Sequence, residues 1–128
     1  MPGIFGIGVD LVEIARIAAL RERHGDSFHD LLFLKEETKY CLNRANPDEC
    51  FAARFAAKEA VMKALGTGWA DGVAFTGIEV VRTSGGKPEI RLHGSTAAKA
   101  KELGVGKIHL SLSHSRDNAI AQAVAESL

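Results

Sequence analysis

The chain has 128 residues, of which 46% are hydrophobic and 25% are charged. This length predicts one domain, residues 1–128, and the composition excludes a disordered or fibrous chain. Sixteen basic residues balance sixteen acidic ones, which argues against a globally basic nucleic-acid-binding protein. No apolar run approaches the ~20 residues of a membrane span, and no secretory signal opens the sequence. We therefore expect a cytoplasmic protein with neither nucleic acid nor a membrane as partner.

The first half of the chain predicts a strand followed by helices. An apolar, glycine-rich run over residues 4–9 is typical of a buried strand. Helical spacing follows over residues 11–20, and Gly25 is a natural stop. Residues 28–42 predict one or two short helices, and the Asn-Pro pair at 46–47 predicts a turn.

The strongest predicted helix is Glu49–Leu65, which is rich in alanine and ends at Gly66. Later elements follow in this order: a hairpin of strands at residues 78–83 and 89–93, a short helix capped by Ser95 and ending at Leu103, and a hairpin of strands at residues 107–113 and 119–125. Helices that come first and hairpins that come later predict an α+β fold with a mostly antiparallel sheet and a long central helix.

The two cysteines, Cys41 and Cys50, match no zinc motif, and a single pair is weak evidence for a disulfide framework. Because the cytosol keeps thiols reduced, we expect two free thiols.

The glycines near the N-terminus do not predict a dinucleotide site. They occur as Gly3-x-x-Gly6-x-Gly8, which is not the G-x-G-x-x-G order, and no βαβ unit follows. Asp10 comes next and has two interpretations. It can cap the following helix, with Glu13 three residues later as in a capping box, or it can bind a metal ion from a strand–helix junction. The local pattern alone favours the cap.

The central helix carries a charged pair among small side chains. At 100° per residue, Glu59 and Lys63 share one face with several alanines, which would let a ligand approach closely. The alternative is an exposed ion pair worth only ~0.3–0.5 kcal/mol. Arg54 and Lys58 lie on the other side, where we expect at least one of them to be solvated.

Hydroxyl and imidazole groups gather where the strand over residues 107–113 ends. Ser111, Ser113 and His114 can donate to phosphate oxygens, and the alternative is an ordinary polar hairpin loop. A serine hydrolase is excluded because the chain has no G-x-S-x-G elbow and no clear acidic partner.

Four segments resemble the holo-(acyl-carrier-protein) synthase family, the small single-unit type of 4′-phosphopantetheinyl transferase. Residues 6–17, GIGVDLVEIARI, resemble its first signature, and residues 51–68, FAARFAAKEAVMKALGTG, resemble its second. Residues 86–88, GKP, and 111–114, SLSH, match later family segments in the same order. The resemblance covers essentially the whole chain and implies the 4′-phosphopantetheinyl transferase fold.

The resemblance implies an enzyme that moves 4′-phosphopantetheine from coenzyme A to a serine of apo acyl carrier protein in fatty acid biosynthesis. The product released is adenosine 3′,5′-bisphosphate. It implies Mg²⁺ held by Asp10 and Glu59, which reverses the preference for a cap, and catalytic roles for Glu59 and Lys63. The group that accepts the serine proton is either Glu59 or a metal-bound water. The implied coenzyme A-binding residues are Lys63, Gly66, Lys87, Pro88, Ser113 and His114.

The first helix offers local positive charge for an acidic carrier protein. Arg16, Leu20 and Arg23 form one stripe at helical spacing, although Glu13 and Glu22 reduce its charge and a solvated face is the alternative. The resemblance implies that this stripe docks the carrier protein. It also implies a homotrimer with sites between subunits.

Two other functions stay open from sequence. One is a non-catalytic nucleotide- or carrier-binding module, and the other is a metal-dependent phosphohydrolase that acts on coenzyme A alone. The pairing of Asp10 and Glu59 with Lys63 disfavours the first alternative, because a pure binder has no need of two carboxylates near an anionic ligand.

Overall fold

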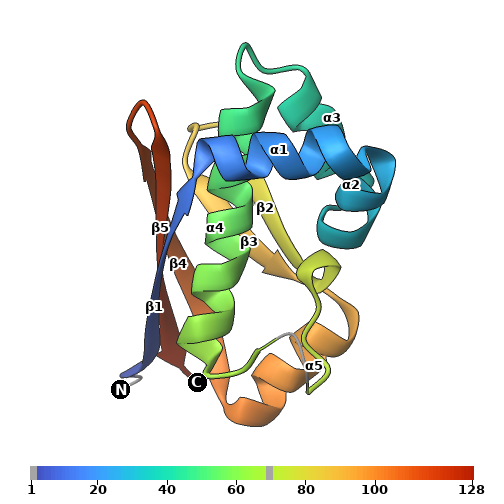
Figure 1. The fold of residues 1–128 in the computed structure, drawn as a ribbon. Helices are drawn as coiled ribbons and strands as arrows, with labels where there is room; N and C mark the ends of the chain where they lie inside the picture. The colour runs from blue at the N-terminus through green and yellow to red at the C-terminus, as the bar shows by residue number, and fades with distance from the viewer. Residues whose placement is uncertain (1–2, 69–70) are drawn as a thin grey trace.

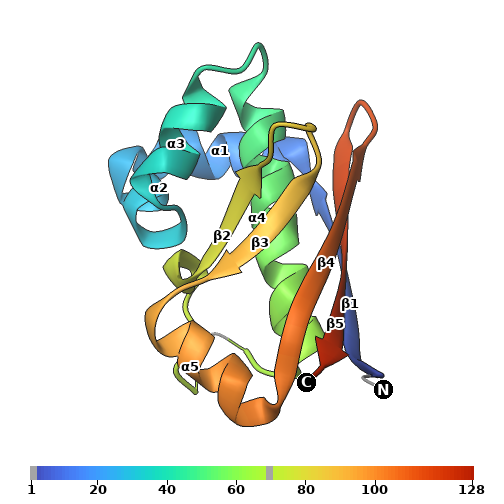
Figure 2. The ribbon, with the colours of Figure 1, turned by 180° about the vertical axis from the view of Figure 1, so that it is seen from behind.

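The computed structural model describes residues 3–68 and 71–128. A long helix, α4 (Pro47–Leu65), packs against a three-stranded antiparallel sheet with strand order β1-β5-β4 (Figure 1). These strands are β1 (Ile4–Glu13), β4 (Val105–His114) and β5 (Asn118–Ser127). A two-stranded antiparallel sheet of β2 (Ile78–Arg82) and β3 (Pro88–Leu92) lies beside β4 (Figure 2).

The shorter helices surround this framework. They are α1 (Ile14–His24), α2 (Asp26–Leu32), α3 (Lys35–Leu42), the single 3₁₀ turn η1 (Phe75–Gly77) and α5 (Gly94–Leu103). In the described part of the chain, the helices are too short or too polar to cross a membrane. The predicted α+β class is confirmed, and the predicted antiparallel sheet is divided into two sheets.

Helix α4 has well-defined signals at both ends. The Asn46 side chain accepts a hydrogen bond from the Glu49 backbone N–H at 3.2 Å, and Pro47 occupies the first turn. Gly66 ends the helix in the left-handed conformation with φ of 75°. The predicted helix is therefore confirmed, with a start two residues earlier than Glu49.

Two glycines bring β1 into direct contact with α4. A Cβ atom at Gly8 would lie 1.9 Å from the Ala60 carbonyl oxygen, and one at Gly6 would lie 2.0 Å from that of Ala64. Only glycine on the strand, facing alanine on the helix, allows the two backbones to approach this closely. The N-terminal glycines thus serve strand–helix packing.

The predicted helix cap at Ser95 is wrong, and so is the cap that the local pattern alone favours at Asp10. Asp10 lies inside β1, because antiparallel pairing with β5 continues as far as Glu13, and α1 begins only at Ile14. At α5 the N-cap position belongs to His93, and the Ser95 hydroxyl donates instead to the Gly72 carbonyl at 2.7 Å.

The expectation of a solvated side chain at Arg54 or Lys58 is also wrong. The two residues are 4% and 0% exposed. Arg54 donates to the Val80 carbonyl at 2.9 Å, and Lys58 Nζ donates to Glu37 Oε1 at 2.7 Å. Their partners come from β2 and α3, which helical periodicity in α4 cannot reveal.

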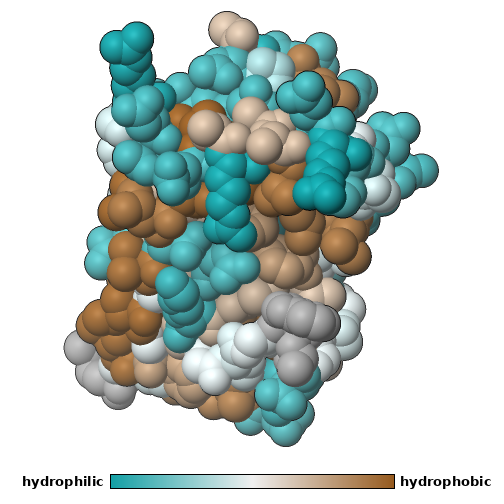
Figure 3. Space-filling model, in the orientation of Figure 1, coloured by the Kyte–Doolittle hydropathy of each residue, from teal (hydrophilic) through white to brown (hydrophobic). Residues whose placement is uncertain are grey.

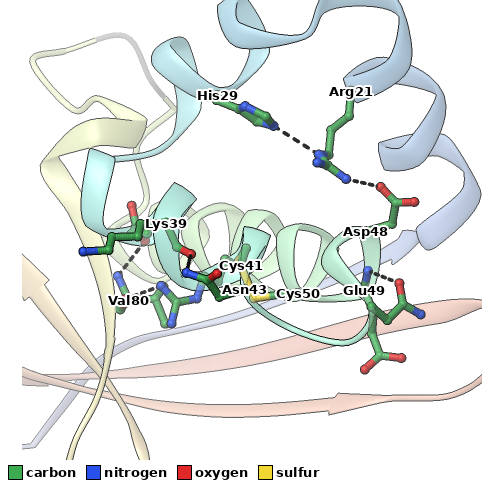
Figure 4. The surroundings of a disulfide bond; sticks show 12 residues. Arg21, His29, Lys39, Cys41, Asn43, Asp48, Glu49, Cys50 and Val80 are labelled. Carbon is green, nitrogen blue, oxygen red and sulfur yellow. Dashed lines mark hydrogen bonds and ion pairs between the residues drawn. A yellow bond between two sulfur atoms is a disulfide. The ribbon is translucent and has the colours of Figure 1, made fainter.

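The structure pairs Cys41 with Cys50, contrary to the expectation of free thiols (Figure 4). Cys41 lies near the end of α3 and Cys50 in the first turns of α4, and their Cα atoms are 5.3 Å apart. This separation falls in the usual range for a disulfide. The bond closes the loop that joins the two helices.

The glycine contact generates a stability prediction. We expect Gly8→Ala to destabilise the protein by at least about 2 kcal/mol, because the new methyl group must push β1 away from α4. Urea unfolding followed by circular dichroism measures the change. Gly85→Ala is the matched control, because a Cβ there meets no atom within 4 Å. Equal stability of the two variants would contradict the close-contact interpretation.

Candidate active site

The contact between β1 and α4 gathers Asp10, Glu59 and Lys63 at one edge of the sheet. Asp10 follows Gly8 on the face of β1 that looks toward α4. Lys63 Nζ donates to the Asp10 carboxylate at 3.2 Å and to the Val9 carbonyl at 3.0 Å. The Asp10 side chain is 16% exposed and that of Lys63 is 54% exposed, so the cluster lies at the surface.

The surroundings of Glu59 make its negative charge unfavourable. Burial raises the pKa of Glu59, and the nearby Asp10 carboxylate raises it further. The positive charges of Lys63 and Arg16 act in the opposite direction and do not cancel the rise in pKa. A bound cation would reduce the repulsion between these two half-buried carboxylates.

The donor set fits Mg²⁺. Among residues 3–68 and 71–128, no group of three or more His, Cys, Asp or Glu side chains could enclose a metal ion. Mg²⁺ does not need such a cage, because it is usually held by one or two carboxylates, with water and substrate phosphates as its other ligands. Asp10 and Glu59 supply that number of carboxylates.

A separate cavity of about 370 Å³ lies between α3, α4, β2 and β4. Three arginines, Arg44, Arg54 and Arg82, line it, together with Ser113 and His114 at the end of β4. Arginine and histidine donors are well suited to phosphate oxygens. Of the polar cluster predicted at the strand end, Ser113 and His114 line this cavity and Ser111 does not.

Sequence reasoning missed the three arginines of this cavity. Arg54 is part of the second signature, but periodicity in α4 predicts that at least one of Arg54 and Lys58 is solvated. Arg44 and Arg82 come from the loop before α4 and the end of β2, with no local motif around them. Only the tertiary packing of α3 and β2 against α4 brings them together.

The predicted site residues fall into separate places in one chain. Asp10, Glu59 and Lys63 adjoin β1, and none of them lines the arginine cavity, which contains Ser113 and His114. Gly66 follows Lys63 closely and donates its N–H to the Lys63 carbonyl at 3.1 Å. Lys87 lies in the turn between β2 and β3, and Pro88 is the first residue of β3. Neither residue lines this cavity.

The predicted stripe on α1 is only partly exposed. Arg16 and Arg23 are exposed, whereas Leu20 is half-buried and packs against the core. Arg21 is engaged within the protein, because it pairs with Asp48 and its guanidinium lies 4.3 Å from the centre of the Phe51 ring. The stripe therefore offers two exposed charges, at Arg16 and Arg23, and little apolar surface.

Comparisons with known proteins agree with this architecture. The family model of the 4′-phosphopantetheinyl transferase superfamily matches residues 6–124. The chain therefore belongs to the 4′-phosphopantetheinyl transferase superfamily. It is 50% identical over 123 residues to a holo-(acyl-carrier-protein) synthase of Clostridium kluyveri, covering 96% of this chain and 90% of that protein.

Solved structures show the same relationship. A holo-(acyl-carrier-protein) synthase from Neisseria meningitidis superposes with a TM-score of 0.92 at 35% identity, covering 98% of this chain and 100% of that one. The Helicobacter pylori enzyme, solved in complex with coenzyme A, superposes with a TM-score of 0.83 at 29% identity, covering 93% and 98% of the two chains.

The raised pKa of Glu59 predicts a pH-dependent stability in the absence of divalent metal. The folded state holds the Glu59 proton more tightly than the unfolded chain, so stability falls as rising pH ionises this carboxyl group. We expect Glu59→Gln to have a higher Tm than the wild type at pH 7, and the two Tm values to converge below about pH 4.

Thermal unfolding in metal-free buffer across this pH range measures the effect. Glu89→Gln, at an exposed position in β3, controls for the loss of one negative charge. A Glu59→Gln protein less stable than the wild type at pH 7 would show that Glu59 supports the metal-free fold.

Proposed function

We propose that this protein transfers 4′-phosphopantetheine from coenzyme A to a serine of apo acyl carrier protein and releases adenosine 3′,5′-bisphosphate. The observation that carries the proposal is the cluster of Asp10, Glu59 and Lys63 beside an independent arginine cavity. The relatives named above, including one solved with coenzyme A, support the same activity. We further propose that the reaction serves fatty acid biosynthesis in the cytoplasm.

The chemistry follows from the charges in the cluster. The serine hydroxyl oxygen attacks the phosphorus that bears pantetheine, a new P–O bond forms, and the diphosphate P–O bond breaks toward the bisphosphate. Mg²⁺, held by Asp10 and Glu59, would neutralise negative charge on the diphosphate. Lys63 Nζ, now bonded to Asp10, is exposed enough to donate to a phosphate oxygen.

We propose Glu59 as the group that accepts the serine proton. The proton leaves the hydroxyl as the new P–O bond forms, and the carboxylate becomes neutral. Burial and the Asp10 carboxylate raise the pKa of Glu59 in the metal-free protein. A cation bound to the same carboxylate would lower that pKa again.

The separation of the acidic cluster from the arginine cavity supports a site shared between subunits. The arginine cavity, with Ser113 and His114, is suited to the phosphates of the coenzyme, but the acidic cluster of the same chain lies elsewhere. A neighbouring copy could supply the missing half, as in a homotrimer. Lys87, Pro88 and Gly66 would then contact the coenzyme from the edges of the site.

An exposed apolar surface supports such an assembly. Ile7, Val9 and Leu11 alternate along the outer face of β1 and are 57%, 51% and 64% exposed. Ile120 continues this surface on β5, directly opposite Leu11. Apolar side chains gather along the edge of the molecule where β1 runs (Figure 3). Exposed apolar patches of this kind are typical of subunit interfaces.

A mass assay tests the proposed activity. The protein is incubated with coenzyme A, Mg²⁺ and apo carrier protein, and the carrier is weighed by intact-mass spectrometry. We expect a mass gain equal to one phosphopantetheine, and a loss of more than about a hundredfold in rate for Asp10→Asn with an unchanged circular dichroism spectrum. Release of bisphosphate without carrier would favour a phosphohydrolase, and binding without either product would favour a non-catalytic module.

The exposed charges of α1 predict how the carrier protein docks. We expect Arg16→Glu to raise KM for apo carrier protein about tenfold at low salt, because repulsion replaces attraction to an acidic partner. Steady-state kinetics with each substrate varied in turn measures this effect. Lys107→Glu, an exposed change at the far end of β4 from α1, is the control. An unchanged KM for carrier protein in Arg16→Glu would place the docking surface elsewhere.

A further inference from the structure

Three charged side chains are buried together between α3 and α4, and one of them, Arg54, lines the arginine cavity. Glu37, Arg54 and Lys58 are 1%, 4% and 0% exposed. Burying a charge is costly unless it is paired and hydrogen-bonded, so such a group needs a reason. The proposed reaction uses neither Glu37 nor Lys58.

Glu37 joins three elements through its two carboxylate oxygens. Oε1 accepts hydrogen bonds from Lys58 Nζ at 2.7 Å and from the Leu34 backbone N–H at 3.0 Å. Oε2 accepts one from the Val80 backbone N–H at 2.9 Å. This single side chain therefore fixes α3 to both α4 and β2.

Arg54 binds the carbonyl group of Val80, the residue whose N–H group donates to Glu37. Its Nη1 donates to the Val80 carbonyl at 2.9 Å, so Glu37 and Arg54 hold the N–H and the C=O of Val80. The Arg54 guanidinium also lies 4.3 Å from the centre of the Tyr40 ring. Tyr40 follows Glu37 by one turn of α3, so both contacts of Arg54 depend on where Glu37 anchors that helix and strand.

We propose that Glu37 is a positioning residue for phosphate binding, which acts by holding the Arg54 guanidinium against the arginine cavity. The proposal rests on the proposed function, in which that cavity takes the phosphates of coenzyme A. Glu37 itself does not line the cavity, whereas Arg54 does. Lys58 balances the buried charge of Glu37 and has no contact with the cavity.

The electrostatics of the cluster agree with this role. Burial lowers the pKa of Arg54, and Glu37 is the strongest influence in the opposite direction. Lys58 has the same balance, with burial lowering its pKa and Glu37 opposing the change. The Glu37 carboxylate therefore favours the charged form of both Arg54 and Lys58, and of these two only Arg54 lines the cavity.

Two single substitutions separate positioning from simple stability. Glu37→Gln removes the negative charge and weakens the hold on the Val80 N–H, whereas Lys58→Met leaves both contacts of Glu37 to backbone N–H groups intact. Both variants should lower Tm, because each leaves a buried group unpaired. We expect Glu37→Gln to raise the Kd for adenosine 3′,5′-bisphosphate on the order of tenfold, and Lys58→Met to leave it within about twofold.

The double variant Glu37→Gln/Lys58→Met keeps the test decisive if a single variant unfolds. Replacing a whole buried ion pair by neutral groups is often tolerated, so we expect its Tm to recover while its Kd stays high. Isothermal titration well below Tm measures the Kd, and kinetics should show a raised KM for coenzyme A with an unchanged KM for carrier protein. Lys99→Met/Glu102→Gln removes the surface pair of α5 and serves as the matched control.

Two results would overturn the proposal. One is an unchanged Kd both in Glu37→Gln and in the double variant. The other is a Kd that follows Tm across all variants and therefore recovers in the double variant. Arg54→Gln removes the guanidinium itself, so its Kd for the bisphosphate sets the upper limit for the effect of misplacing that guanidinium. If the wild-type protein neither binds the bisphosphate nor modifies a carrier, the proposed function fails instead.

Discussion

The backbone contact between β1 and α4 is the constraint on which the acidic cluster depends. Gly6 and Gly8 bring the strand against Ala64 and Ala60, at distances that any side chain on the strand would forbid. Asp10 stands one alternation further along the same strand face, and Lys63 one turn from Glu59 on the helix. Without that approach, Lys63 could not reach both the Val9 carbonyl and the Asp10 carboxylate.

Helix α4 is held differently on its two sides. Toward β1 the contact is made by small residues and backbone. Toward α3 and β2 it is made by a buried network centred on Glu37, which fixes Arg54. The helix thus connects a repulsive pair of carboxylates on one side with a buried, hydrogen-bonded network on the other, in which Glu37 faces the two cations Arg54 and Lys58.

The sequence predicts what local patterns encode. Helix α4, the two later hairpins and the face shared by Glu59 and Lys63 follow from periodicity, capping and glycine stops. The cap at Asp10 is wrong because pairing with β5, more than a hundred residues away, extends the strand past it. Arg54, Lys58 and the cysteine pair are misjudged for the same reason, since their partners are set by how α3 and β2 pack on α4.

The position of β1 at the edge of its sheet bears on how copies of the chain could associate. It is an edge strand of its sheet, and an edge strand with an apolar outer face is prone to unwanted association unless something covers it. The acidic cluster lies at this same edge, while the arginine cavity opens on the other side of α4. In the proposed shared site, a second copy docked on β1 would bury the apolar side chains. The same contact would then protect the edge and add the residues of a second copy to the limited concave surface that one small domain offers to a long ligand.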